Sequence, residues 1–184
     1  MDRSAGRLPS VTGDGETVTW LHVATRRVVA SFLDALARSH GWQRLFIVSP
    51  WISDFTAEGG IAFSQLLKRL SDDDATAYVV SRPPIEGWHR SALDRIAATG
   101  KANIALVPSL HTKLYCADTD QGAFALVASA NFTEQSLANR EIGVLIRSSG
   151  AGRQIVRKLM NEASDIYRSS DRQLMCQRRF STGA

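Results

Sequence analysis

The residues best suited to chemistry lie between His111 and Asn131, with Glu141 a short way beyond them. Apolar side chains follow Lys113 without helical spacing, which predicts a strand that includes His111 and Lys113. Because side chains alternate along a strand, these two would lie on the same face. A His and a Lys side by side on a sheet face are difficult to bury alone. The pair therefore indicates a site for an anion.

The neighbours of this pair are expected to have structural roles. Alternation places Tyr115 on the same face as the pair, whereas Leu114 and Cys116 face the opposite way. Thr112 also faces away, and we expect it and Cys116 to lie in the core. Asp118 is predicted to sit in a turn after the strand, where it holds the loop or pairs with a nearby base.

Polar residues downstream strengthen the anion hypothesis. Ser129 and Asn131 precede a short helix that is expected to begin near Thr133, and a helix N-terminus supplies donors and a positive dipole end. Simple N-capping by Asn131, with no ligand, explains the same pattern. Glu141 falls on the next predicted strand, where the alternative is an ordinary exposed strand residue.

Together these residues resemble the HKD motif of the phospholipase D superfamily. That motif reads His-x-Lys, four residues, Asp, then Gly-Ser-x-Asn and a downstream Glu. The matching residues here are His111, Lys113 and Asp118, then Ala128-Ser129-Ala130-Asn131, then Glu141. Two departures are the Ala at the first position of the second element and a longer gap before it. The extra residues fall in a polar turn, where insertion is tolerated.

The resemblance implies phosphodiester transfer without a metal or another cofactor. One His attacks phosphorus and forms a phosphohistidine, and a second His protonates the leaving oxygen and later activates water. Lys113, Ser129 and Asn131 would hold the phosphate oxygens, and Glu141 would accept from a His111 ring and fix its tautomer. Family members with one motif pair two chains, so the resemblance implies a homodimer with one His111 from each chain in a shared site.

Four weaker candidates lie outside the motif. Arg82 follows a strand end and could bind a phosphate, although a solvated loop cation is the simpler interpretation. Trp51 could stack on a base or enter lipid, with core packing as its alternative. His89 begins a predicted helix and is expected at the surface. The run at residues 72–74, Asp-Asp-Asp, is interpreted as a solvated turn rather than a metal site.

Alternating apolar runs predict an α/β fold with a mixed, largely parallel sheet covered by helices on both faces. Helices are expected at residues 23–39, 61–70 and 88–99, near residue 133 and around residues 155–166. Strands are expected at residues 44–50, 75–81, 103–108, 124–129 and 141–146, in addition to the His111 strand. One catalytic domain would span residues 19–170, between a loose N-terminal tail at 1–18 and a basic C-terminal tail at 171–184.

Composition favours a globular cytoplasmic protein. Of the 184 residues 44% are hydrophobic and 22% are charged, and neither a signal peptide nor a membrane-spanning run is visible. Cys116 and Cys176 do not suggest a disulfide framework. The net charge is +4, and from Arg147 onward the chain carries eight basic and three acidic residues. This end favours a polyanion such as nucleic acid or an anionic membrane, or it is simply a solvated helix and tail.

Three functions are consistent with the sequence. The first is a homodimeric nuclease that cuts DNA or RNA, and some members that it resembles belong to bacterial defence systems with a helicase or ATPase partner. The second is a phospholipid hydrolase or transferase with the same catalytic residues. The third is a non-catalytic subunit that acts through a partner protein. A basic groove with salt-sensitive binding would indicate the nuclease, and an apolar rim would indicate the lipid enzyme.

Overall fold

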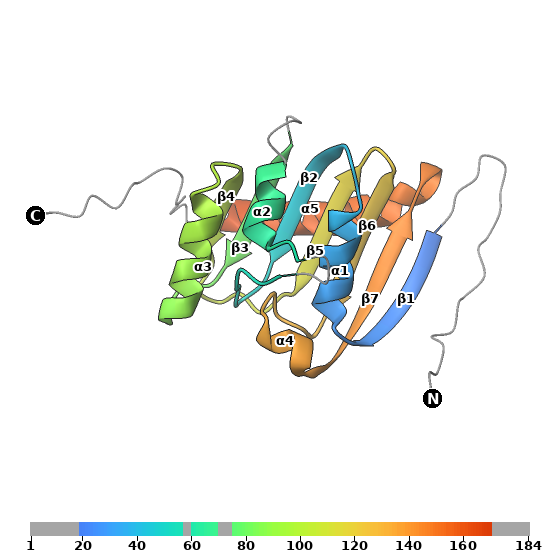
Figure 1. Ribbon diagram of the computed structural model, residues 1–184. Coiled ribbons are helices and arrows are strands. Elements are labelled where there is room, and N and C mark those ends of the chain that lie inside the picture. Colours follow the sequence, from blue (N-terminus) through green and yellow to red (C-terminus); the bar gives the residue numbers. More distant parts are fainter. Residues whose placement is uncertain (1–18, 57–59, 70–74, 171–184) are drawn as a thin grey trace, which may run out of the picture.

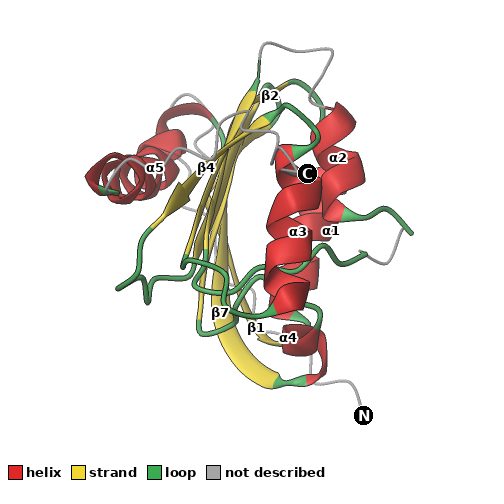
Figure 2. Ribbon diagram, turned by 90° about the vertical axis from the view of Figure 1, so that its left-hand side faces the viewer, coloured by secondary structure: helices red, strands yellow, loops and turns green. Residues whose placement is uncertain are grey.

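A single seven-stranded sheet forms the centre of the fold. The computed structural model describes residues 19–56, 60–69 and 75–170. The strands are β1 (Thr19–Arg26), β2 (Trp42–Val48), β3 (Thr76–Ser81), β4 (Ala102–Leu106), β5 (Leu114–Thr119), β6 (Gly122–Ala128) and β7 (Arg140–Ser148). The helices are α1 (Val28–Ala37), α2 (Phe63–Arg69), α3 (Gly87–Ala97), α4 (Gln135–Ala138) and α5 (Arg153–Ser169), with a 3₁₀ turn, η1 (Gly150–Gly152), before α5. Figures 1 and 2 show α1 to α4 on one face of the sheet and α5 on the other.

The expected mixed α/β sheet is present, but the expectation that it is largely parallel is wrong. The strand order is β1-β7-β6-β5-β2-β3-β4. Among the strand pairs of the described residues, β2–β3 and β3–β4 are parallel and the other four are antiparallel. For β5 and β6 the reason is their connection, because the two residues between them allow only a hairpin, whereas a parallel pair requires a long crossover.

The first strand was missed, and the expected helix at 23–39 begins too early. Residues 19–26 form the edge strand β1, and α1 starts at Val28. Between them Arg27 has a φ of 51°, a left-handed conformation that is uncommon for a residue with a side chain. No glycine marks this break, and the helix expected at 23–39 therefore takes in the last four residues of β1.

Two separate apolar layers cover the sheet. Along β2, Leu45 and Ile47 pack in the larger core beneath α1 and α3, whereas Phe46 belongs to the smaller core beneath α5. Tyr115 joins the larger core and Cys116 the smaller one, which confirms the alternation expected at this point. Burial raises the pKa of the Cys116 thiol, as expected for a side chain that only packs.

The strand after His111 begins later than expected and continues further. His111 and Lys113 lie in the loop before β5, so strand alternation does not govern their direction. Thr112 is exposed rather than in the core. Asp118 is not in a turn, because β5 extends to Thr119 and buries this carboxylate.

Gly143 of β7 permits the close approach of α1 to the sheet. A Cβ at this position would overlap Cγ1 of the fully buried Val28 and would lie 3.0 Å from Cδ1 of Leu126. We therefore expect Gly143→Ala to lower the free energy of unfolding by about 1–3 kcal/mol through overpacking. Urea denaturation monitored by circular dichroism measures this difference.

Gly87 provides the matched control. It begins α3, and a Cβ there would have nothing within 4 Å. Gly87→Ala should leave stability unchanged or raise it by a few tenths of a kcal/mol, because alanine restricts the unfolded chain. Equal unfolding free energies for the two variants would contradict the packing described between β7 and α1.

Candidate functional site

The ends of several strands meet at one edge of the sheet. Strands β2 and β6 end there and β5 and β7 begin there, because Leu114 pairs with Val48 and with Val127, and Ala128 pairs with Gly143. The parallel strand β3 ends beside β2 at the same edge. The segments that follow or precede these ends therefore gather in space. They contain the motif residues near 111, 129 and 141 and also the loops after Val48 and Ser81.

His111 is exposed and in contact with a cation. Nη2 of Arg82 lies 2.8 Å from Nε2 and 3.2 Å from Nδ1 of the imidazole, and Nε of Arg82 donates to the carbonyl of Leu110 at 2.7 Å. Nζ of the half-buried Lys113 donates to the carbonyl of His111 at 2.9 Å. Because a guanidinium can only donate, a ring nitrogen of His111 is the acceptor in this contact. Arg82 is thus a neighbour of His111, not a solvated loop cation.

Ser129 and Glu141 form a second polar group at this edge. The Ser129 hydroxyl donates to Oε2 of Glu141 and accepts from the amide of Ile142 at 3.1 Å. Glu141 therefore contacts Ser129 of its own chain, and its predicted bond to a His111 ring stays a prediction. Asn131 is half-buried, and its Oδ1 has no hydrogen-bond partner among the described residues.

The segment that holds Asn131 is fixed by two buried hydroxyls that the sequence did not suggest. The Tyr115 hydroxyl donates to the carbonyl of Ala130 at 2.7 Å. Oγ of Ser49 accepts from the amide of Phe132 at 2.9 Å and donates to the carbonyl of Trp51 at 2.8 Å. Burial raises the pKa of Tyr115, which keeps this hydroxyl protonated as a donor, and the nearby charge of Glu141 also raises it.

The helix expected to begin near residue 133 does not supply an anion site. The helix α4 begins at Gln135, has only four residues, and receives no side-chain cap. Ser129 and Asn131 lie well before its first residue. The segment therefore offers the site the side-chain donors of Ser129 and Asn131 but no helix dipole.

Asp118 lies at the opposite end of β5 from the site. From Leu114 to Asp118 the strand extends roughly 13 Å. The carboxylate is buried and ion-paired, with Oδ1 3.5 Å from Nη1 of Arg153 and Oδ2 3.9 Å from Nη2 of Arg44. These contacts join the first residue of α5 to the sheet. Such a position suits the structural role predicted for Asp118, although the reason is burial in a strand and not the expected turn.

A cluster of rings lies beside Arg82. The Trp51 ring is 6.4 Å from that of Trp88 and 5.5 Å from that of His89, between centroids, and Cζ of Arg82 lies 6.0 Å from the centre of Trp51. Trp51 is half-buried and so belongs partly to the surface. His89 was expected at the surface, but it is fully buried, because α3 turns it inward onto Oγ of Ser81 at 2.9 Å.

His89 is expected to make the protein less stable in mild acid. Burial lowers its pKa from the ordinary 6.5, and its Nδ1 has no hydrogen-bond partner among the described residues. Below pH 6.5 the unfolded chain therefore binds a proton that the folded chain does not, so the folded state loses stability as the pH falls. The loss is about 1.4 kcal/mol for each unit by which the pKa is lowered.

The measurement is the difference in unfolding free energy between pH 7.5 and pH 5.5, by urea titration. His89→Gln removes the titrating ring and should show a smaller difference than the wild type. His22→Gln is the control, because His22 is exposed on β1 and should behave like the wild type. Parallel pH profiles for all three proteins would show that the burial of His89 does not influence stability.

No group of three or more His, Cys, Asp or Glu side chains in the described ranges is arranged to hold a metal ion. The Asp run at residues 72–74, Cys176 and the predicted tails at 1–18 and 171–184 lie outside these ranges. Within them, no helix combines the length and the apolar character needed to cross a membrane.

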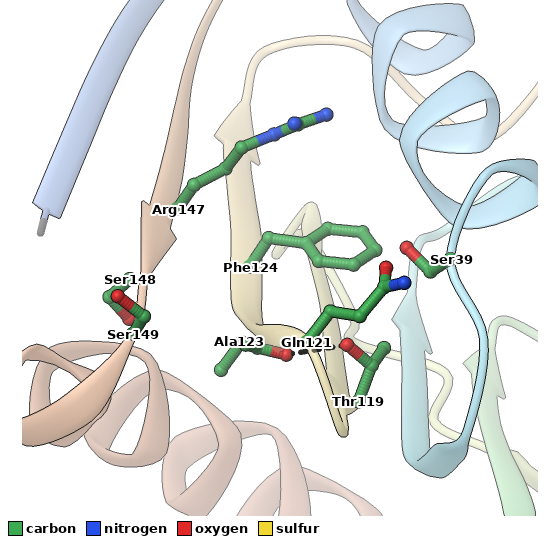
Figure 3. A pocket seen from close by; sticks show the side chains of 9 residues that line it. Ser39, Thr119, Gln121, Ala123, Phe124, Arg147, Ser148 and Ser149 are labelled. Carbon is green, nitrogen blue, oxygen red and sulfur yellow. Dashed lines mark hydrogen bonds between the residues drawn. The ribbon is translucent and has the colours of Figure 1, made fainter.

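A pocket of about 320 Å³ lies at the other edge of the sheet, away from His111. It lies where β6 begins and β7 ends, and Figure 3 labels its lining residues except Gly122. The lining consists of Ser39, Thr119, Gln121, Gly122, Ala123, Phe124, Arg147, Ser148 and Ser149. Desolvation lowers the pKa of Arg147, and the charge of Arg38 lowers it further. No side chain in this lining is suited to act as a nucleophile with a neighbouring base. The end of the sheet where His111 lies is therefore the better candidate for catalysis.

No family model and no curated protein matches this sequence. Solved structures do match. Nuc of Salmonella typhimurium, a phospholipase D family member, has a TM-score of 0.58 at 15% identity over 84% of this chain and 97% of its own. NucT from Helicobacter pylori has a TM-score of 0.57 at 14% identity over 84% and 98%. Phosphatidylserine synthase of Haemophilus influenzae has a TM-score of 0.54 at 12% identity over 83% and 39%. At these identities the likeness concerns the fold.

Proposed function

From the fold of the phospholipase D superfamily, which this chain has, we propose that it is a phosphodiesterase that cuts nucleic acid through a phosphohistidine. The observation that carries the proposal is the contact between His111 and Arg82 at the edge where Lys113, Ser129 and Glu141 also gather. An imidazole next to a cation is an arrangement suited to attack on a phosphate diester.

In the proposed reaction, a ring nitrogen of His111 attacks phosphorus, and the bond from phosphorus to the leaving oxygen breaks. A second His111, from another copy of the chain, gives its proton to that oxygen. The same second ring then takes a proton from water, the hydroxide attacks phosphorus, and the bond between phosphorus and nitrogen breaks. Both rings end in their starting forms. No metal or redox partner enters these steps.

Arg82 would hold the transferred group. In the free protein its guanidinium lies against the His111 ring, within the distance of a hydrogen bond. A phosphate that enters between them supplies oxygens to which the same guanidinium can donate, which frees the ring nitrogen for attack. Lys113, Ser129 and Asn131 are the further candidates for binding the oxygens, since each carries a donor at this edge.

The second histidine would come from a homodimer, and an exposed apolar patch beside the site supports this. Leu21, Val23, Val127 and Ile142 are 42%, 52%, 44% and 59% exposed. We name these four residues the open sheet face. They lie on the α5 side of the sheet, since Val127 follows Ala125 of the smaller core by two residues and pairs with Val144, which also pairs with Val23.

The open sheet face adjoins the candidate site directly. Ser129 lies two residues after Val127, and Glu141 immediately precedes Ile142. A second copy packed here would cover apolar surface that otherwise faces water and would bring its own His111 toward the first. The defence role and the helicase or ATPase partner expected from the resemblance stay predictions.

The test is cleavage by the purified protein in the presence of a chelator. The substrates are single-stranded DNA, duplex DNA, RNA and phosphatidylcholine vesicles. In a second measurement, the reaction with a labelled oligonucleotide is quenched rapidly, and the label bound to the protein is divided into an acid-stable and an acid-labile fraction. We expect cleavage of nucleic acid that persists in chelator, with an acid-labile phosphoryl adduct on His111, because the P–N bond hydrolyses in acid.

Three outcomes would oppose the proposal. Hydrolysis of the vesicles alone would favour the lipid enzyme. Cleavage that requires an added divalent ion would oppose the histidine route. Inactivity on every substrate would favour a non-catalytic subunit. Separately, light scattering that shows a monomer at micromolar concentration would exclude the shared site.

A further inference from the structure

We propose that Trp51, Trp88 and Arg82 form an aromatic shelf that stacks an unpaired nucleobase beside His111, so that the site prefers single-stranded nucleic acid. The inference rests on the proposed function and deepens it, because it names the form of the substrate. It assigns to Trp88 a role that the sequence did not suggest.

Arg82 joins the shelf to the candidate catalytic group. Its Cζ lies 6.0 Å from the centre of the Trp51 ring, while its Nη2 is 2.8 Å from Nε2 of His111. One guanidinium thus contacts both an aromatic ring and the imidazole. A phosphate bound at His111 would have the rings next to it, which is where the base of the same or the adjoining nucleotide extends.

Trp88 is the exposed member of the shelf. It is 47% exposed in the first turn of α3, and its ring centre lies 6.4 Å from that of Trp51 at an interplanar angle of 41°. The next residue, His89, is fully buried against Ser81, which fixes the backbone that carries Trp88. An indole that is held in place and half in water presents a flat apolar face without having to be ordered on binding.

The chemistry of the shelf matches a base better than a lipid. Flat rings and a guanidinium plane attract the face of another flat ring, and each base presents such a face once it leaves the stack. In a duplex both faces are covered by neighbouring bases, so only an unpaired strand can use the shelf. A phospholipid headgroup has the phosphate but no ring to place on Trp88.

The experiment compares binding in a background that cannot cleave. Fluorescence anisotropy is measured with the full-length His111→Asn protein and three labelled ligands of one length, namely oligothymidine, a duplex and an abasic strand. Trp88→Leu keeps an apolar side chain but removes the ring, and Trp88→Phe keeps a ring. Ile155→Ala is the control, because Ile155 is 49% exposed on α5, away from the shelf.

We expect Trp88→Leu to weaken binding of oligothymidine by roughly 5- to 150-fold, the range for loss of one stacked base. Trp88→Phe should stay within about threefold of the parent protein. Binding of the abasic strand and of the duplex should not change in either variant, which also shows that the variants are folded. Ile155→Ala should bind all three ligands like the parent.

The proposed shelf would be wrong if Trp88→Leu bound oligothymidine as tightly as the parent protein. It would also be wrong if Trp88→Leu lost as much affinity for the abasic strand as for oligothymidine. Binding to phosphatidylglycerol vesicles is measured by co-sedimentation for the same variants. If Trp88→Leu loses vesicle binding but keeps oligothymidine binding, the surface belongs to lipid, which also overturns the shelf. The proposed function can fail separately. If the wild-type protein cleaves no phosphodiester but oligothymidine binding depends on Trp88, the catalytic proposal fails and the shelf stands.

Discussion

Replacing His111 with asparagine is expected to lower the rate of nucleic acid cleavage by roughly 10⁴-fold or more, the scale seen when a covalent nucleophile is removed. The reason is that the proposed route uses this ring twice, as the nucleophile of one chain and as the acid and base of the other. Asparagine keeps a polar side chain of similar size but cannot form the phosphorus–nitrogen bond. Initial rates on a labelled oligonucleotide in chelator measure the loss.

Two controls separate chemistry from structure. His111 is exposed, so His111→Asn should leave the free energy of unfolding within about 0.5 kcal/mol of the wild type. His22→Asn replaces another exposed histidine, on β1, and should retain full activity. Substantial cleavage by His111→Asn in chelator would show that this ring is not the nucleophile.

Features that depend on neighbouring residues were predicted better than features that depend on residues far apart in the sequence. Local patterns predicted most strands and helices to within a few residues, as for the helix expected at 88–99 and found as α3 at Gly87–Ala97. The alternation of Tyr115 and Cys116 was also correct, since a strand turns successive side chains to opposite faces. These features depend only on neighbours in the chain.

Strand pairing was predicted poorly because it depends on partners far away in the sequence. β1 pairs with β7, more than a hundred residues later, and only this pairing and the left-handed Arg27 distinguish it from the start of a helix. The turn between β5 and β6 did carry the information for an antiparallel pair, because two residues cannot make a crossover.

The sequence motif identified the candidate residues of the site, but the residues that reach them from distant segments were missed. The segments at one edge of the sheet contain His111, Lys113, Ser129, Asn131 and Glu141, whose roles stay predictions. Contacts between distant segments were not visible in the sequence. Arg82 reaches His111 only because β3 ends beside the loop that precedes β5, and Ser49 holds Phe132 across more than eighty residues.

The second large effect is expected at the open sheet face. Ile142→Asp should convert the proposed dimer to a monomer at low micromolar concentration, because an aspartate buried within an apolar interface would lose its water without gaining a partner. Since Ile142 is 59% exposed in the single chain, the folded monomer should tolerate the change. Sedimentation velocity over a range of concentrations measures the dissociation constant, which we expect to rise by 100-fold or more, on the order of 3 kcal/mol.

Activity should fall together with the dimer. If both histidines must meet at one phosphate, Ile142→Asp will lose cleavage in proportion to the dimer lost, and high protein concentration will restore part of it. Ile155→Asp is the matched control, since this exposed isoleucine lies in the first turn of α5, near the opposite edge of the sheet. A monomeric Ile142→Asp that cleaves at the wild-type rate would mean that one chain holds a complete site. His111 would then need its proton donor from its own chain, and the shared-site reaction would be wrong even with His111 as nucleophile.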